Sequence, residues 1–172
     1  FPSYFRNLTR DMFVFAAFTG MAYADIKQLT CKDLVTTDDG NLWIVKARKK
    51  TGTVSRIRLL DIPVRIIEKY KDERIGDKVF PMPGYTTIDV NLKRIAEICG
   101  INRSVSFHQA RHSFASQVCL SQGVPIETVS RMLGHKDIHT TQIYAAVSTQ
   151  KISSDMQKLS QRIAGKYSLI NQ

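Results

Sequence analysis

The sequence predicts a single α+β domain that is mainly helical and contains a small three-stranded antiparallel sheet. Apolar residues recur at steps of three and four over most of the chain, which is the spacing of amphipathic helices. Three short segments between residues 33 and 60 have the composition of strands, with turn residues between them. The chain has 172 residues, of which 43% are hydrophobic and 23% charged, so it is large enough for one domain with a buried core.

Two helices are expected before the sheet. Residues 7–18 place their apolar side chains on one buried side, and Gly20 ends this helix. A second helix is expected over residues 23–29. We expect the three strands over residues 33–37, 42–47 and 54–60, because the segments between them contain the turn residues aspartate, threonine and glycine.

Two further helices are expected after the sheet, over residues 63–71 and 86–99. A loop rich in proline and glycine separates them at residues 75–85. The second helix ends at a glycine, and its apolar positions predict which side chains are buried. These are Ile88, Leu92, Ile95 and Ile98.

The C-terminal half is predicted to be helical throughout. A long helix over residues 106–121 begins at Ser106, which suits an N-cap, and a shorter helix over 126–133 ends at Gly134. A short helix over residues 137–144 and an amphipathic tail helix over 148–172 follow. The tail repeats apolar residues at helical steps, namely Ile152, Met156, Leu159 and Ile163.

The chain is strongly basic, with a formal net charge of +10 and an isoelectric point near 9.7. A basic surface favours a polyanionic partner such as nucleic acid, although it also serves solubility alone. No apolar run approaches the roughly 18 residues of a membrane span, and no signal peptide is indicated. Cys31, Cys99 and Cys119 lie far apart and are expected to be reduced thiols in the cytoplasm.

Four side chains suited to act on a phosphate occur between residues 107 and 144. His108 and Arg111 are three residues apart and therefore share one face of the expected helix. Arg111 offers a planar set of donors to phosphate oxygens, and His108 and His135 are able to move a proton near neutral pH. Tyr144 carries a hydroxyl that is able to attack phosphorus. Together these side chains predict phosphoryl transfer.

The same residues resemble the tyrosine recombinases, also called phage-type integrases. The second motif of that family, His-x-x-Arg-His-Ser/Thr-Phe-Ala, is matched from His108 to Ala115. The third motif, Leu-Gly-His, ends at His135, and Tyr144 follows nine residues later, as the family's nucleophilic tyrosine does. The resemblance implies catalytic roles for Arg111, His108, His135 and Tyr144. It further implies a site-specific recombinase that cuts and rejoins double-stranded DNA through a 3′-phosphotyrosyl intermediate, without metal ion, cofactor or ATP.

The resemblance covers nearly the whole chain, so residues 1–172 are expected to form one catalytic domain. In the family a DNA-clamping domain precedes it, and the chain begins at Phe1 rather than at a methionine, so we expect a piece of a longer protein. The tail at residues 148–172 is implied to dock on a neighbouring subunit, which links a homo-tetramer on DNA. The alternative, in which the tail covers its own domain, stays open.

The chain departs from the family at the first motif, Thr-Gly-Leu-Arg-x-Ser-Glu/Asp-Leu. Ala22 stands where the motif has its arginine. Asp25 matches the acidic position and is expected to orient His108 or Arg111, unless it is an ordinary charge in the first turn of a helix. A missing donor to the phosphate costs about 10²–10³ in rate unless another cation replaces it. The candidate replacements, which the sequence does not rank, are Arg6, Arg10, Lys27 and Arg48.

Lys50 is expected to be the general acid. The hairpin between the second and third strands carries a lysine beside the cut in the family, and Lys50 stands directly before the Thr-Gly turn. Lys49 is the alternative, and a pair of lysines at a hairpin tip is also common on solvated surfaces.

Several other functions remain open on the sequence alone. His108 and His112, like His135 and His139, are four residues apart as in helical zinc sites, but neither pair belongs to a His-Glu-x-x-His motif. The two helices around Gly123 are similar to a non-enzymatic helix-turn-helix module, which does not need Tyr144. A type IB topoisomerase or a hairpin telomere resolvase uses a similar set of side chains. The target sequence, and the choice among integration, excision, inversion and dimer resolution, are not indicated.

Overall fold

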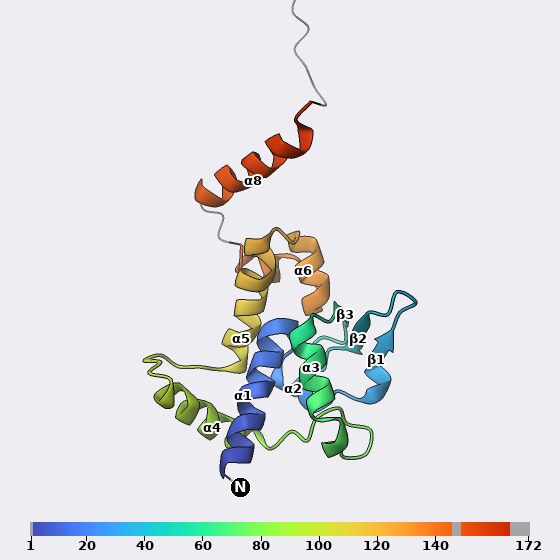
Figure 1. Ribbon diagram of the computed structural model, residues 1–172, viewed down its shortest axis with the longest axis vertical. Helices are drawn as coiled ribbons and strands as arrows, with labels where there is room; N and C mark the ends of the chain where they lie inside the picture. The colour runs from blue at the N-terminus through green and yellow to red at the C-terminus, as the bar shows by residue number, and fades with distance from the viewer. Residues whose placement is uncertain (1, 146–148, 166–172) are drawn as a thin grey trace, which may run out of the picture.

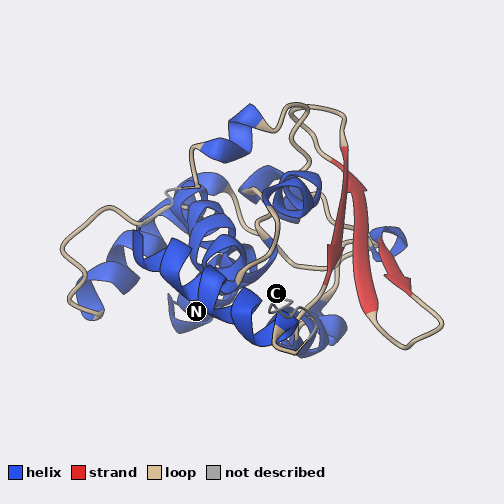
Figure 2. Ribbon diagram, turned by 90° about the horizontal axis from the view of Figure 1, so that it is seen from above, coloured by secondary structure: helices blue, strands red, loops and turns tan. Residues whose placement is uncertain are grey.

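The computed structural model describes residues 2–145 and 149–165. Helices dominate, and one small sheet lies at the edge of the domain (Figures 1 and 2), so the predicted fold class is confirmed. The helices and strands are α1 (Pro2–Thr19), α2 (Tyr23–Lys27), β1 (Leu34–Thr36), β2 (Leu42–Ala47), β3 (Val54–Arg58), α3 (Asp61–Lys69), α4 (Tyr85–Ile98), α5 (Phe107–Ser113), α6 (Ile126–Leu133), α7 (His139–Gln142) and α8 (Thr149–Ile163). Short 3₁₀ turns cover Cys31–Asp33, Lys71–Glu73 and Leu120–Gln122.

The core surrounds α1, which contacts α3, α4 and α5 (Figure 1). The apolar side chains of its middle turns, including Leu8, Met12 and Phe15, are fully buried, as the sequence predicts. The helix starts five residues earlier than expected, because Pro2 suits the first turn of a helix. In α4 the prediction for Ile98 is wrong, since this side chain is 64% exposed and the helix buries Ala96 instead.

The sheet has the order β1-β2-β3, and both pairs are antiparallel. Successive side chains along each strand point to opposite faces of the sheet. Ile44 on β2 and its partner Ile57 on β3 point to the same face and are buried in the core. The hairpin from β2 to β3 reaches the end of α6, where the hydroxyls of Thr51 and Ser55 donate to the carbonyls of Gly134 and Met132. These bonds bring the sheet next to the C-terminal helices.

The long helix expected over residues 106–121 is divided into three parts. It begins at α5, where the Ser106 hydroxyl accepts a hydrogen bond from the N–H of Gln109, and continues as a π-helix over Phe114–Cys119 and a 3₁₀ turn. The Ser116 hydroxyl donates to the His112 carbonyl at 2.9 Å. This side-chain hydrogen bond competes with the backbone hydrogen bond that the same carbonyl accepts in a regular α-helix. The wider turn buries Phe114 and Ala115 together, directly after the last turn of α5.

The tail helix α8 lies beyond the end of the domain that holds α6 (Figure 1). It covers most of the predicted tail, while residues 148 and 166–172 of that prediction lie outside the described residues. Its apolar side chains at the predicted spacing are all exposed, namely Ile152, Met156, Leu159 and Ile163. Among the described helices, none has the length and hydrophobicity that crossing a membrane requires.

Gly20, in the turn between α1 and α2, has a conformation and a position that only glycine fits. Its φ is +68°, and an added β-carbon would come within 3.0 Å of the side chains of Phe114 and Leu133. Gly20→Ala is expected to lower the free energy of unfolding by about 2–5 kcal/mol, since left-handed strain and overpacking add. Urea unfolding followed by circular dichroism measures this change.

Gly40→Ala is the matched control, because Gly40 has a φ of +76° but no atom within 4 Å of an added β-carbon. Its free energy of unfolding should fall by only about 1–2 kcal/mol, which is the cost of the left-handed backbone conformation. Equal stabilities of the two variants would contradict the packing argument.

Candidate active site

A cleft of about 810 Å³ opens between α2, the β2–β3 hairpin, α5 and the segment that follows α6. All the side chains that the sequence analysis assigned to catalysis line it. They are Lys50, His108, Arg111, His135 and Tyr144. Long-range packing therefore brings together residues that are up to 94 positions apart in the sequence, from Lys50 to Tyr144.

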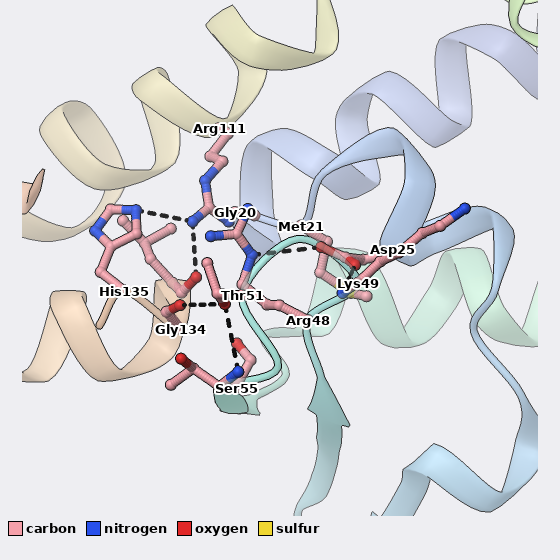
Figure 3. Close-up of polar contacts among 12 residues, drawn as sticks. Gly20, Met21, Asp25, Arg48, Lys49, Thr51, Ser55, Arg111, Gly134 and His135 are labelled. Carbon is pink, nitrogen blue, oxygen red and sulfur yellow. Dashed lines mark hydrogen bonds and ion pairs between the residues drawn. The ribbon is translucent and has the colours of Figure 1, made fainter. Parts of the chain in front are cut away.

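Arg111 is held at the bottom of the cleft. Its residue exposure is 6%, and its guanidinium donates to the carbonyl of Gly20 and, at 2.7 Å, to the carbonyl of Leu133 (Figure 3). Burial, followed by the charge of Arg48, lowers the pKa of Arg111 to about 10, although Tyr144 and Asp25 act to raise it. Arg111 is therefore a fixed cation at neutral pH, as phosphate binding requires.

His135 follows the left-handed turn at Gly134, and both of its ring nitrogens have partners. Nε2 lies 3.0 Å from the Nη2 of Arg111, and Nδ1 lies 2.8 Å from the hydroxyl oxygen of Thr141. Burial, followed by the charges of Arg111 and Arg48, lowers the pKa of His135 to about 4. The ring is consequently neutral at neutral pH.

Tyr144 lies on the wall of the same cleft, two residues beyond α7. Its residue exposure is 7%, and its ring packs edge-on against His112 at 4.6 Å between centroids. The ring of His135 lies nearly parallel to it at 6.4 Å. Arg111 lines the same cleft, and Tyr144 acts to raise the pKa of its guanidinium. The expected nucleophile and the expected phosphate ligand thus meet within one chain.

The hairpin presents Lys50 to the cleft, whereas Lys49 does not line it. The backbone N–H of Lys49 donates to Asp25 at 2.9 Å, and its side chain runs away from Arg111 (Figure 3). Lys50 is therefore the better placed of the two lysines. His108 also lines the cleft and is exposed, three residues before Arg111 on α5.

Asp25 differs from the expectation. It is buried, and its carboxylate contacts the hairpin instead of His108 or Arg111, with Oδ2 3.5 Å from the Nε of Arg48. Its influence on Arg111 is electrostatic, since it raises the pKa of that residue. The reason is geometric, because the segment that directly follows β2 places Arg48 and the N–H of Lys49 at the carboxylate of Asp25.

Arg48 is the candidate cation that reaches the cleft. Arg6, Arg10 and Lys27 do not line it, whereas Arg48 lines it together with Ala22. Its side chain is 11% exposed, and its Nε has no hydrogen-bond partner among the described residues. Arg48, Asp25 and Arg111 also line one small internal cavity, and the two guanidinium groups lie beside each other in Figure 3. Sequence position alone gave no means to choose it.

No three metal-ligating side chains of the His, Cys, Asp or Glu type gather anywhere in the described ranges. The histidine pairs considered for zinc are instead divided between different contacts. His112 packs on Tyr144, and Nδ1 of His139 lies 2.8 Å from the amide oxygen of Gln142.

A mainly helical domain that gathers arginine, histidine, a hairpin lysine and a late tyrosine around one cleft defines the class of tyrosine-recombinase catalytic domains. A model of the phage integrase family matches residues 4–151. The chain therefore belongs to the phage integrase family.

Individual relatives agree with this placement. The chain is 33% identical over 127 residues to tyrosine recombinase XerA of Saccharolobus solfataricus, covering 73% of this chain and 41% of the relative. The chain thus spans less than half the length of that relative. The crystal structure of XerA recombinase matches 88% of this chain and 62% of its own, with a TM-score of 0.66 and 20% identity. The XerH recombinase bound to difH substrate matches 87% of this chain and 45% of its own, with a TM-score of 0.67 and 21% identity. Both structures share the fold.

Proposed function

We propose that the chain is the catalytic domain of a site-specific DNA recombinase or integrase, which forms a 3′-phosphotyrosyl intermediate. The observation that carries the proposal is that Tyr144, Arg111 and His135 line one cleft of a single chain. The net charge of +10 supports a polyanionic substrate. The matching solved structures include recombinases bound to DNA, such as XerH with difH and a lambda integrase dimer with a core site. Double-stranded DNA is accordingly the proposed partner, and the cytoplasm the proposed location.

The proposed reaction exchanges one phosphate ester for another. The phenolic oxygen of Tyr144 attacks phosphorus and transfers its proton to His108, while the bond from phosphorus to the 5′ oxygen breaks. Lys50 gives a proton to that leaving oxygen. The product is a tyrosyl ester of the 3′ phosphate and a free 5′ hydroxyl, and the reverse reaction rejoins the strand without ATP because one ester is kept throughout.

Positive charge stabilises the transition state. Negative charge grows on the phosphate oxygens, and Arg111 faces the cleft as a fixed cation. Arg48 is proposed to supply the second guanidinium, in the space beside Ala22, with Asp25 holding it. This assignment gives Asp25 a supporting role through Arg48, and it requires no metal ion.

The proposed assembly is a homo-tetramer on DNA, linked through α8. The apolar side chains of this helix are exposed instead of packing on the domain, and Ile152 and Met156 are more than half exposed. An amphipathic helix with an uncovered apolar face is stabilised by burying that face on another surface. Docking on a neighbouring subunit satisfies this requirement.

A trapping experiment tests the proposed function. The protein is incubated with a pool of nicked duplexes whose core sequence is randomised, so that the free 5′ fragment is lost after cleavage and the covalent adduct accumulates. We expect an SDS-resistant adduct, with the DNA attached to Tyr144 in peptide mass spectrometry and with one core sequence enriched. Adduct formation without sequence enrichment, together with relaxation of supercoiled plasmid, would favour the topoisomerase alternative. DNA binding without any adduct would favour the helix-turn-helix alternative.

The role of Lys50 is open to chemical rescue. Lys50→Ala should slow cleavage of ordinary DNA by about 10²–10⁴-fold, the usual contribution of a general acid. A substrate with sulfur in place of the 5′ bridging oxygen has a leaving group that needs no proton, so it should restore most of the rate. Single-turnover cleavage on both substrates measures this effect.

Lys49→Ala serves as the matched control and should behave like the unaltered protein on both substrates, because Lys49 is absent from the cleft wall. Failure of the sulfur substrate to rescue Lys50→Ala would point to another proton donor.

A further inference from the structure

Thr141 lies on the short helix α7, next to the His135 side chain that lines the cleft. The residue is fully buried, and its hydroxyl oxygen is 2.8 Å from the Nδ1 of His135. A buried hydroxyl is unfavourable unless it has a hydrogen-bond partner, and the imidazole of His135 is that partner. The backbone carbonyl of Thr141 accepts a hydrogen bond from the N–H of Tyr144 at 3.0 Å. Thr141 therefore connects His135 to the turn that carries the proposed nucleophile.

The contacts of His135 determine which ring nitrogen carries hydrogen in the free protein. A guanidinium group has donors and no acceptor, so the Nε2 that faces Arg111 at 3.0 Å must accept. The hydrogen of the neutral ring is then on Nδ1, and it is donated to the Thr141 hydroxyl. The charged and titratable groups around the ring are Arg111 on α5, Arg48 on the hairpin and Tyr144 after α7, with Lys136 and Asp137 on the adjoining cleft wall.

A phosphate in the cleft needs the opposite arrangement. Phosphate oxygens only accept hydrogen bonds, so His135 contributes a donor only when the hydrogen is on Nε2. Nδ1 must then either accept a hydrogen bond or remain protonated in an imidazolium. A threonine hydroxyl is able both to donate and to accept, so rotation of its hydrogen serves both states without moving the ring. A carboxylate in this place would only accept, and a methyl group would leave Nδ1 unpaired.

From these contacts we infer that Thr141 is a positioning residue, which fixes the ring of His135 and lets its hydrogen change from Nδ1 to Nε2 when a DNA phosphate enters. The inference rests on the proposed recombinase function. Thr141 then has a role in cleavage although it does not line the cleft. The hydroxyl group of Thr141, more than the shape of its side chain, is what this role requires.

Substitutions at Thr141 separate the hydroxyl from the shape. Thr141→Val keeps the shape and removes the hydroxyl, so we expect single-turnover cleavage to fall by about 10–100-fold, the usual effect of losing a partner of a catalytic histidine. Thr141→Ser keeps the hydroxyl and should stay within about threefold of the unaltered protein. DNA affinity, measured by fluorescence anisotropy, should be the same in all three proteins. The dependence of the cleavage rate on pH should change in Thr141→Val alone.

A double-mutant cycle shows whether Thr141 acts through His135. His135→Ala combined with Thr141→Val should be no slower than His135→Ala alone. The inference would be overturned if the cleavage rate of the double variant fell by the product of the two single losses. It would also be overturned if Thr141→Val cleaved at the unaltered rate.

Ring nitrogen chemical shifts of ¹⁵N-labelled histidine test the same idea in the unaltered protein, so the result does not depend on how the variants fold. We expect hydrogen on Nδ1 of His135 in the free protein and on Nε2 with nicked DNA bound. Hydrogen on Nε2 already in the free protein would contradict the inference while leaving the proposed function intact. Absence of any Tyr144 adduct in the unaltered protein would instead remove the proposed function, and with it the role of Thr141 in catalysis.

Discussion

Tyr144→Phe is expected to abolish the covalent protein–DNA adduct and to leave DNA binding unchanged. Phenylalanine keeps the ring that packs edge-on against His112 at 4.6 Å, so the fold of the cleft is retained and only the attacking oxygen is lost. Removal of a catalytic nucleophile lowers the rate by up to about 10⁶-fold. Denaturing gels of the trapped complex and fluorescence anisotropy with the same duplex measure the two properties separately.

Tyr85→Phe is the control for this experiment. Tyr85 lines the same cleft and is 58% exposed, so it is a second phenol within reach of bound DNA. Its loss should leave adduct formation intact. An adduct that persists in Tyr144→Phe and disappears in Tyr85→Phe would transfer the nucleophilic role to Tyr85.

Arg48→Ala is expected to lower the cleavage rate by about 10²–10³-fold, because a single charged donor to the transition state contributes that much. The prediction depends on Arg48 supplying the charge that Ala22 lacks. Ala22 lines the same cleft, so Ala22→Arg added to Arg48→Ala should recover a large part of the lost rate. The cleavage rate of Arg48→Lys should lie between those of the unaltered protein and Arg48→Ala, since lysine keeps the charge but not the planar fork of donors.

Arg56→Ala is the matched control, because Arg56 is an exposed arginine of the neighbouring strand and does not line the cleft. It should cleave at the unaltered rate. Circular dichroism melts separate loss of charge from loss of folding in each variant. Full activity of Arg48→Ala, or no recovery on adding Ala22→Arg, would assign the second cation elsewhere.

Local sequence signals predicted the fold well where one residue type controls the backbone. Glycine and aspartate turns predicted the sheet and its two hairpins, and Gly134 predicted the end of α6. Glycine adopts left-handed backbone angles without strain, and an aspartate side chain accepts hydrogen bonds from the backbone of its own turn. Periodicity was less reliable, because it predicts which side chains share a face but not whether another element covers that face. Ile98 is three residues after Ile95 and fits the helical spacing, yet its side chain is 64% exposed, whereas Ala96, four residues after Leu92, is buried.

The candidate site shows the same division. Motif spacing placed Arg111, His135 and Tyr144 together, because short segments with fixed turns link them. The selection of Arg48 from four basic residues depended on its contact with Asp25 of α2, which is a long-range contact with no local signal. The partner of His135 was also beyond sequence reasoning, since Thr141 resembles its neighbour Thr140 until the register of α7 is known.

The turn at Gly134 has a consequence for how this chain is able to vary. A β-carbon at position 134 would come within 2.7 Å of the Cδ of Arg48, so the stem of that arginine passes through space that any other amino acid would fill. Two positions 86 residues apart are therefore constrained as a pair, 48 and 134. A descendant that enlarged the turn would displace this guanidinium, and a new cation on α2 would be needed to take its place beside Arg111.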